Sequence, residues 1–454
     1  MDSRSTQLQF DFLSTNHPET LDISAKPGPA NRGSNKLSPQ DRAFHDWYRF
    51  VLSFPPHLVR HYLNKFNLSG DHVILDPFCG TGTTLIEAKL AGVKSIGLEA
   101  NQFPFFASTV KLDWNLSPEF LTSQTQEIAN VARAMLQTQG IDDNSIFDQA
   151  PEKFTLRTLP KEGMSLLLKN SISPLPLHKT LILRDCLDEY KDQPFYRHAR
   201  LGLANALVYK ISNLHFGPEV GVKKPKTDVP VMDNWLTEIE KIANDLRSVQ
   251  GKNFPESNIY RADARNMESI PSNSIDAVIT SPPYPNEKDY TRTTRLESVL
   301  LGFIKTKEEL RILKKGLVRS NTRGVYQDDD DDRWVSDNLE IQRLAEEIEN
   351  RRIALGKDSG FEKQYSKVTR LYFGGMARHL AELRRVLRPG AQLAYVVGDQ
   401  ASYLRVMIRT GQLLAEIAAT LGYKVVDIDL FRTRLATATK EQLREEVVLL
   451  QWKG

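Results

Sequence analysis

The succession of apolar and polar positions along the chain predicts an α/β core. Residues 72–101 read as a strand, a Gly/Thr loop, a helix, a glycine-containing turn and a second strand, which is the start of a parallel βαβ unit. Strand patterns return near residues 257–264 and 274–284. The chain closes with a helix over 369–387, a turn at 388–390, a strand over 392–399, a helix over 411–422, and strands over 424–431 and 445–452. We expect the last two strands to pair antiparallel at a sheet edge.

Several stretches fall outside this pattern. Residues 1–38 are rich in Ser, Pro, Asn and Gly and predict a flexible tail. Helical spacing from Ser38 onward is broken by Pro55 and Pro56, which predicts two short helices and a turn. The mainly helical stretch after Trp114 is far longer than a normal crossover connection, so we expect an inserted region at 117–255 and a second insertion at 303–365. The catalytic domain is then assigned to 39–116, 256–302 and 366–454.

Composition excludes some classes of protein. The chain is 40% hydrophobic and 26% charged, and it has no apolar run near the ~20 residues of a membrane helix. Its amino terminus lacks the features of a secretory signal, so we expect a cytoplasmic protein without membrane contact. The 60 basic and 57 acidic residues give a formal charge of +3, which is too balanced to indicate a polyanionic partner. Contact with nucleic acid must therefore be local.

The first candidate site is the Gly/Thr loop DPFCGTGTT, which follows a predicted strand and precedes a helix. Gly80 and Gly82 allow a sharp turn and a close approach of the backbone to a ligand. Asp76, at the end of the strand, can accept a hydrogen bond from an ammonium group. The helix amino terminus near Thr83 favours a carboxylate. Together they predict a site for an amino-acid moiety such as methionine.

Two more carboxylates extend this site. Glu99 closes the second strand, where an acidic side chain binds ribose hydroxyls, and Asp263 follows the next strand, where it can accept an adenine amino group. The set favours S-adenosylmethionine as the cofactor. A dinucleotide is the alternative, but Leu85 stands where its fingerprint needs a third glycine or alanine.

The second candidate site is the loop that follows the apolar strand VIT. Its residues are Ser281, Pro282, Pro283 and Tyr284. An aromatic amino group is a poor nucleophile until acceptors hold its hydrogens, and we expect the Ser281 hydroxyl and the Pro282 carbonyl to be those acceptors. Tyr284 can stack on a base that has been swung out of a duplex. We predict catalysis of amino-group methylation without a metal.

Cysteines and acidic residues narrow the chemistry further. Methylation at cytosine C5 needs a thiolate that follows a proline, whereas Cys79 follows Phe78 and Cys186 follows Asp185. Two cysteines also build neither a disulfide framework nor a zinc site. The five consecutive aspartates at 328–332 lack the glycine-fixed geometry of a calcium loop, so we predict a flexible acidic loop and assign no metal.

The two motifs resemble those of the amino-methyltransferase family of DNA modification enzymes. Residues 76–84 match its cofactor motif, and SPPY matches its catalytic motif, in which Asp, Asn or Ser precedes PPY or PPW. The resemblance implies a Rossmann-like methyltransferase fold, a mixed sheet with helical insertions, and S-adenosylmethionine. It adds Pro77, Phe78, Thr83 and Thr84 to the cofactor-binding residues. The aromatic segment 44–59 is similar to a further segment that contacts the methionine part.

The same resemblance implies the substrate. A serine at the first position of the catalytic motif is associated with cytosine N4, so we expect site-specific methylation of that atom in double-stranded DNA by base flipping, within a restriction-modification system with a cognate endonuclease. Adenine N6 is the alternative. The order of the motifs implies that target recognition lies in 117–255, with a contribution from the second insertion at 303–365. Lysines in a Gly/Pro-interrupted stretch and arginines of a basic run are candidate DNA contacts, with a solvated surface as the alternative: Lys223, Lys224, Lys226, Arg319 and Arg323.

Two other functions compete with this one. Some tRNA guanine-N2 methyltransferases share a DPFCGTG-like motif, but they carry an RNA-binding domain ahead of the catalytic core, and here little chain precedes the motif. A module that keeps the fold and only binds DNA or protein is the second, because fold does not determine function. The complete SPPY loop argues against it.

Overall fold

A seven-stranded mixed sheet forms the centre of the computed structural model, which describes residues 37–50, 53–144, 155–217, 219–286, 288–435 and 442–454. The strand order is β5-β2-β1-β6-β7-β9-β8. All neighbours pair in parallel except β7 with β9 and β9 with β8. The strands are β1 (Val73–Asp76), β2 (Lys94–Leu98), β5 (Ser257–Tyr260), β6 (Ile275–Thr280), β7 (Leu387–Gly398), β8 (Lys424–Leu435) and β9 (Gln442–Gln451). The predicted α/β fold and its antiparallel edge pair are confirmed.

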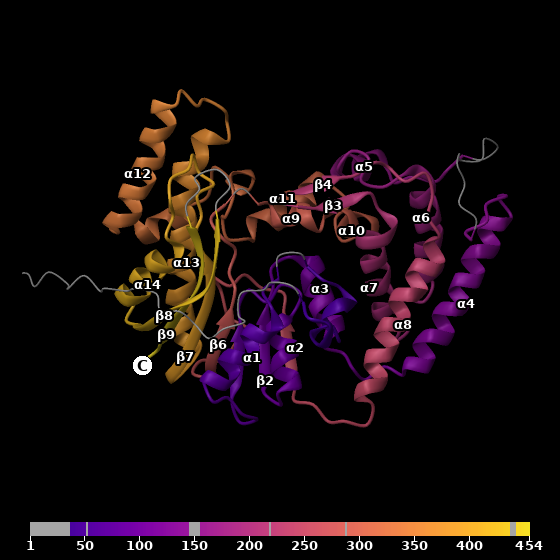
Figure 1. Ribbon diagram of the computed structural model, residues 1–454, viewed down its shortest axis with the longest axis horizontal. Helices are drawn as coiled ribbons and strands as arrows, with labels where there is room; N and C mark the ends of the chain where they lie inside the picture. Colours follow the sequence, from indigo (N-terminus) through magenta and orange to yellow (C-terminus); the bar gives the residue numbers. More distant parts are fainter. Residues whose placement is uncertain (1–36, 51–52, 145–154, 218, 287, 436–441) are drawn as a thin grey trace, which may run out of the picture.

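Helices cover both faces of the sheet because successive strand residues point to opposite sides. Ile74 packs with Leu58 of α1 (Pro56–Lys65), on the same face as α2 (Thr83–Leu90). Leu75 belongs to the core beneath α13 (Tyr365–Val386) and α14 (Thr410–Thr420) on the other face. The two faces are visible on either side of β7 and β6 in Figure 1. Both faces are therefore buried, which explains the almost continuous apolar run in β6.

The first insertion is a helical lobe that packs on α3 (Gln102–Lys111). Figure 1 shows α4, α6, α7 and α8 together on the right of the molecule, and contacts join all four. A small hairpin, β3 (Leu214–Phe216) with β4 (Val220–Val222), lies in the stretch that carries the candidate lysines. The helices are α4 (Pro118–Gln137), α5 (Lys161–Leu166), α6 (Pro174–Asp188), α7 (Tyr196–Ala206), η3 (Leu207–Ile211) and α8 (Val231–Val249). The helical content expected for this region is confirmed.

The second insertion runs from the sheet across the top of the molecule and back onto α13 (Figure 1). Two short helices, α9 (Tyr290–Thr293) and α10 (Arg295–Leu300), lead into it. It contains α11 (Lys307–Lys315), η4 (Thr322–Gly324), η5 (Asp331–Val335), α12 (Leu339–Ala354) and η6 (Glu362–Gln364). The assignment of 117–255, 303–365 and the remaining segments as separate domains stays a prediction.

Local structure differs from expectation in two places. Ahead of α1 the chain forms two 3-10 turns, η1 (Pro39–Asp41) and η2 (His45–Trp47), and Pro55 and Pro56 begin α1 because proline tolerates the first helical turn. The turn expected at 388–390 lies inside β7, where the pairing with β6 shifts in register and Gly390 has φ of 91°. Residues 1–36 of the predicted tail lie outside the described residues. Within those residues, none of the helices has the length and apolarity to cross a membrane.

Candidate active site

A cavity of about 760 Å³ opens at the carboxyl ends of the parallel strands, where open α/β sheets bind ligands. Four separate segments line it: the Gly/Thr loop after β1, the end of β2, the turn after β5 and the SPPY loop after β6. The second insertion supplies a further wall, residues 314–324. The predicted cofactor and catalytic motifs therefore face one space.

The Gly/Thr loop forms a cradle at this cavity because its backbone adopts conformations that favour glycine. Gly80 and Gly82 have φ of 52° and 86°. A Cβ at Gly82 would lie 3.1 Å from the Cβ of Ser108, so glycine is also needed for close packing on α3. Gly82 caps α2 without a side chain, which leaves the first turn of that helix free to receive an anion.

Glu99 is held at the floor of the cavity by two backbone donors. Its Oε2 accepts from the N–H of Gly80 at 2.9 Å, and its Oε1 accepts from the N–H of Asn101 at 2.7 Å. Burial raises the pKa of Glu99 to about 7 despite these bonds. The remaining lone pairs of the carboxylate suit the hydroxyls of a ribose.

Asp76 is the last residue of β1, as expected. Its side chain is buried beneath the cavity and does not line it. Oδ1 accepts from the Thr280 hydroxyl at 2.6 Å and from the N–H of Phe78 at 3.1 Å, and burial raises the pKa of Asp76 to about 6. The contact with an ammonium group expected from the sequence stays a prediction, and the Oδ2 atom of Asp76 has no hydrogen-bond partner among the described residues. Asp76 also connects the cofactor loop to the end of β6, directly before the catalytic loop.

The other residues of the cofactor motif fall into two groups, those that line the cavity and those that do not. Pro77, Phe78, Gly80 and Thr83 line the cavity. Gly82 and Thr84 do not, and the Thr84 hydroxyl donates to the carbonyl of Ile279 in β6. The Thr84 bond joins the cofactor loop to β6, and the cofactor contacts expected of Gly82 and Thr84 stay predictions.

His379 on α13 supports the adenine side of the cavity, and the sequence did not reveal it. Its ring meets the ring of Phe78 edge-on at 4.9 Å between centroids. Burial lowers the pKa of His379 to about 4, so the ring is neutral. Since the Ala264 carbonyl only accepts, Nδ1 donates to it at 2.9 Å and Nε2 accepts from the Tyr395 hydroxyl at 2.7 Å. A lone histidine on an apolar helix face carries no signal of this role.

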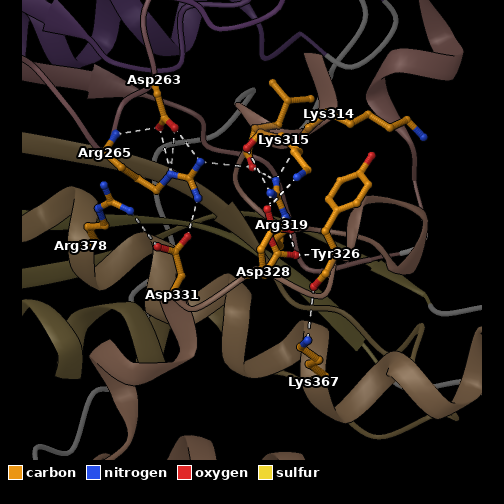
Figure 2. Close-up of polar contacts among 12 residues, drawn as sticks. Asp263, Arg265, Lys314, Lys315, Arg319, Tyr326, Asp328, Asp331, Lys367 and Arg378 are labelled. Atoms are coloured by element: carbon orange, nitrogen blue, oxygen red, sulfur yellow. Dashed lines mark hydrogen bonds and ion pairs between the residues drawn. The ribbon is translucent and has the colours of Figure 1, made fainter. Parts of the chain in front are cut away.

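Asp263 lines the cavity. Figure 2 shows that its carboxylate is paired with the guanidinium of Arg265. Its side chain is 29% exposed, and both of its oxygens accept from the guanidinium of Arg265. Arg265 also pairs with Asp331 of the second insertion, which contacts Arg378 at 3.2 Å. The predicted adenine acceptor is therefore connected to the second insertion through one buried arginine.

The catalytic loop is fixed to the core at its two ends. The Ser281 hydroxyl donates to the carbonyl of Val396 in β7 at 3.1 Å, and it also interacts with the Tyr284 side chain. The N–H of Tyr284 donates to the Tyr290 hydroxyl at 3.3 Å. The Tyr284 ring lies against Gly398, where a Cβ would be 3.1 Å from its Cε2. Ser281, Pro282, Pro283 and Tyr284 all line the cavity.

The second insertion closes the cavity opposite this loop. The carbonyl of Ser320 accepts from the N–H of Asn286 and from the Tyr403 hydroxyl, both at 2.9 Å. The ammonium group of Lys314 pairs with Asp289 at 2.7 Å. Residues 314–321 thus hold the segment that follows SPPY, and no motif in the sequence indicated this.

Two predictions for the second insertion are corrected by its ion pairs (Figure 2). Arg319 is 5% exposed, and its guanidinium pairs with Asp329 at 2.7 Å and donates to backbone carbonyls, so it is not available to DNA. The acidic run is not a flexible loop, because Asp329 and Asp331 are buried in these pairs. No group of residues suited to hold a metal occurs in the described part of the chain.

The remaining candidate DNA contacts lie at the surface. Lys223 and Lys224 are exposed beside β4, and Arg323 is exposed with its guanidinium 5.7 Å from the centre of the Phe361 ring. Lys226 differs, because its ammonium group donates to the carbonyls of Lys210 and Ser212 at 2.5 and 2.8 Å. It therefore stabilises its own loop. Three of the five candidates keep a cation directed to solvent.

The fold and the site define a methyltransferase that uses S-adenosylmethionine. The residues fit this cofactor: an uncapped helix end suits its carboxylate, Glu99 its ribose and Asp263 its adenine, in one cavity with the SPPY loop. The family model N6_N4_Mtase, described as DNA methylase, matches residues 26–105. The matched residues include the Gly/Thr loop, so the segment that carries the cofactor motif is similar to the amino-methyltransferase family of DNA methylases.

Curated relatives cover most of the chain. It is 27% identical to the type II methyltransferase M.BsoBI of Geobacillus stearothermophilus over 88% of this chain and 83% of that protein. It is 23% identical to the type II methyltransferase M.AvaI of Nostoc sp. over 87% of this chain and 81% of that protein. The type II methyltransferase M.MjaII of Methanocaldococcus jannaschii is 36% identical over 17% of this chain and 14% of that protein.

Proposed function

We propose that this methyltransferase modifies the N4 atom of cytosine at a specific site in double-stranded DNA, as the protective partner of a restriction endonuclease. The observation that carries the proposal is the position of Ser281. It follows β6 at the cavity, and its hydroxyl hydrogen is directed to the carbonyl of Val396. A type II role is suggested by relatives that are named type II methyltransferases and that match most of this chain.

The loop supplies the acceptors that an amino group needs. Bound S-adenosylmethionine provides an electrophilic methyl group that is bonded to a sulfonium sulfur. When the methyl group is transferred, its bond to sulfur breaks and the sulfur leaves as a thioether. The Ser281 oxygen and the Pro282 carbonyl accept the two amino hydrogens, so the nitrogen lone pair is withdrawn from conjugation with the ring and directed at the methyl carbon. One hydrogen leaves the nitrogen as a proton once the carbon–nitrogen bond has formed. Prolines at 282 and 283 keep this carbonyl in place because their φ angles are fixed.

A base reaches this loop only outside the duplex, since its amino group is otherwise paired. The face of Tyr284 offers a stacking surface at the cavity. The ring packs against Gly398, and the lack of a side chain there allows the ring to take this position. The same surface accepts adenine, so adenine N6 is the second candidate. Serine at the first motif position favours cytosine.

DNA contact is assigned to the first insertion and the exposed part of the second. Lys223 and Lys224 lie beside the β3–β4 hairpin, and Arg323 lies close to the cavity wall formed by residues 314–324. Their charges suit phosphates of the backbone. We place recognition of the target in residues 117–255.

The test is product identification. The purified protein is incubated with radiolabelled S-adenosylmethionine and unmethylated DNA or RNA, the products are digested to nucleosides, and the labelled species is identified by mass spectrometry. N4-methylcytosine that is lost in Ser281→Ala and kept in Ser402→Ala, a second serine of the cavity wall, supports the proposal. N6-methyladenine overturns the choice of base, and label in RNA alone overturns the choice of DNA.

A further inference from the structure

Among the residues that the structure describes, two lysines are buried, and they differ in their partners. Lys179, in the first insertion, pairs with Asp228 at 2.9 Å and with Asp143 at 3.4 Å. Lys111, the last residue of α3, is 1% exposed, and its ammonium group donates to the carbonyl of Tyr48 at 3.3 Å. It forms no ion pair with a carboxylate in the described part of the chain. A buried cation without a counter-ion is costly unless an anion arrives with a ligand.

Lys111 lies where such a ligand is expected. It lines a small cavity of about 30 Å³ together with Ser53, Thr81 and Thr83. These three residues also line the large cavity, so the two spaces share a wall at the Gly/Thr loop. Thr83 is the first residue of α2, whose amino terminus lacks a side-chain cap. The side chain of Lys111 and the uncapped end of α2 thus border one small cavity, which shares a wall with the large cavity.

The charged groups around Lys111 do not neutralise it. On η2, His45 is bonded to Glu87 at 2.8 Å, and Asp46 is the charge that favours the protonated lysine. Glu87 on α2 is occupied by His45 and by Arg60 of α1 at 2.9 Å. Burial lowers the pKa of Lys111 to about 7, so the free protein has little charge at this site in mild alkali.

We propose that Lys111 binds the carboxylate of the methionine part of S-adenosylmethionine, together with the first turn of α2. The cofactor then lies with its adenine at Asp263, its ribose at Glu99 and its carboxylate at Lys111. The ligand supplies the counter-ion that the folded chain lacks. Binding therefore raises the affinity of Lys111 for its proton.

A comparison of two ligands distinguishes loss of the contact between Lys111 and the carboxylate from general damage to the cofactor site. S-adenosylhomocysteine carries the carboxylate, whereas 5′-methylthioadenosine keeps adenine, ribose and sulfur but lacks the amino-acid group. Titration calorimetry on Lys111→Met is expected to show affinity for S-adenosylhomocysteine weakened about tenfold or more, the usual effect of a lost charge-assisted hydrogen bond. Affinity for 5′-methylthioadenosine is expected to stay within about twofold.

The matched control is Lys89→Met. Lys89 lies at the other end of α2, and its ammonium group also donates to one backbone carbonyl, that of Leu112 at 2.6 Å, but it lines neither cavity. This variant should bind both ligands like the wild type. Equal weakening of both ligands by Lys111→Met, or no weakening of either, overturns the proposal.

A second measurement needs no variant. Calorimetry at about pH 8 in buffers of different ionisation enthalpy gives the protons taken up on binding, and the wild type should take up more with S-adenosylhomocysteine than with 5′-methylthioadenosine. Any contribution of Glu99 is common to both ligands because both contain the ribose. Equal proton uptake with the two ligands contradicts the assignment.

Discussion

The two insertions are attached to the catalytic core by different forces. The first has an apolar interior that is continuous with α3 and contains Trp235, Leu183 and Leu203. The second packs α12 on α13 through Ile341 and Ile348, but beside the cavity it is held by the ion pairs of Arg265 with Asp331 and of Arg319 with Asp329. α11 buries none of its side chains.

The difference matters because the two kinds of attachment fail differently. An apolar interface loses stability in proportion to the volume removed, whereas a buried ion pair fails when one charge disappears, since the other is left without a partner. The first insertion is therefore expected to tolerate changes of charge outside its buried pair of Lys179 with Asp228, and the second to tolerate none at its two arginines. Of the two insertions, the second contacts Asp263 through Arg265 and also contacts the segment after SPPY. Breaking its ion pairs should therefore weaken cofactor binding.

The largest effect is expected in the apolar insertion. Trp235 is fully buried in α8, and its Nε1–H donates to the carbonyl of Ala199 at 2.8 Å. Trp235→Ala should lower the free energy of unfolding by about 3–5 kcal/mol in urea denaturation. Cofactor affinity, measured by calorimetry at a temperature where the variant is folded, should remain unchanged. Weaker cofactor binding would show that the first insertion also shapes the cavity.

The second-largest effect is expected from a substitution in the acidic run, where Asp331 is buried and Asp328 is exposed. Asp331→Asn removes the charge that pairs with Arg265, so we expect a loss of about 3 kcal/mol in stability and weaker binding of S-adenosylhomocysteine, because Asp263 is no longer held by a fixed arginine. The control is Asp328→Asn, whose side chain is 67% exposed in its pair with Lys315 and which should change little. Equal effects of the two substitutions would remove the distinction between the buried and exposed members of the run.

A buried carboxyl group, that of Glu297, makes the stability of the apolar core around the first insertion dependent on pH. Glu297 on α10 accepts from the Tyr48 hydroxyl at 2.5 Å, and burial raises its pKa from 4.5 to about 7. Because the folded value is the higher one, stability is full below the unfolded pKa and falls as pH rises toward 7. Glu297→Gln should therefore gain stability relative to the wild type between about pH 5 and pH 8, by up to about 3 kcal/mol. Urea denaturation across this range is the measurement, and parallel curves would contradict it.

The smallest effect concerns the catalytic loop, which rests on the core and on neither insertion. Gly398→Ala places a Cβ 3.1 Å from the Tyr284 ring, and the ring must move. We expect turnover to fall about tenfold, as misplacement of a reacting group does, with cofactor affinity unchanged. Gly360→Ala, where a Cβ meets nothing within 4 Å, is the control. Full activity of Gly398→Ala would show that turnover does not depend on the position of the Tyr284 ring.

Local motifs predicted the parts of the site that depend on the backbone. Gly80 and Gly82 stand in a strand-loop-helix pattern, and the structure gives both positive φ angles and places Gly80 at the cavity. Ser281 and Tyr284 follow an apolar strand, and parallel strands bring their carboxyl ends to one edge. Arg319 and the acidic run were misjudged because charge runs are usually solvated, and nothing nearby in the chain reveals that arginines and aspartates will pair in the interior.

By itself, the amino-acid sequence determined the α/β class, the cofactor loop and the catalytic loop, because these follow from side-chain periodicity and from backbone needs within a few residues. Only the tertiary structure decided which charged residues face solvent and which are buried. It placed Asp76 below the cavity, Arg319 in an ion pair and Lys111 at a small cavity that shares residues with the large one. The physical reason is that the fate of a charge depends on partners far away in the chain, and only the packed fold brings those partners together.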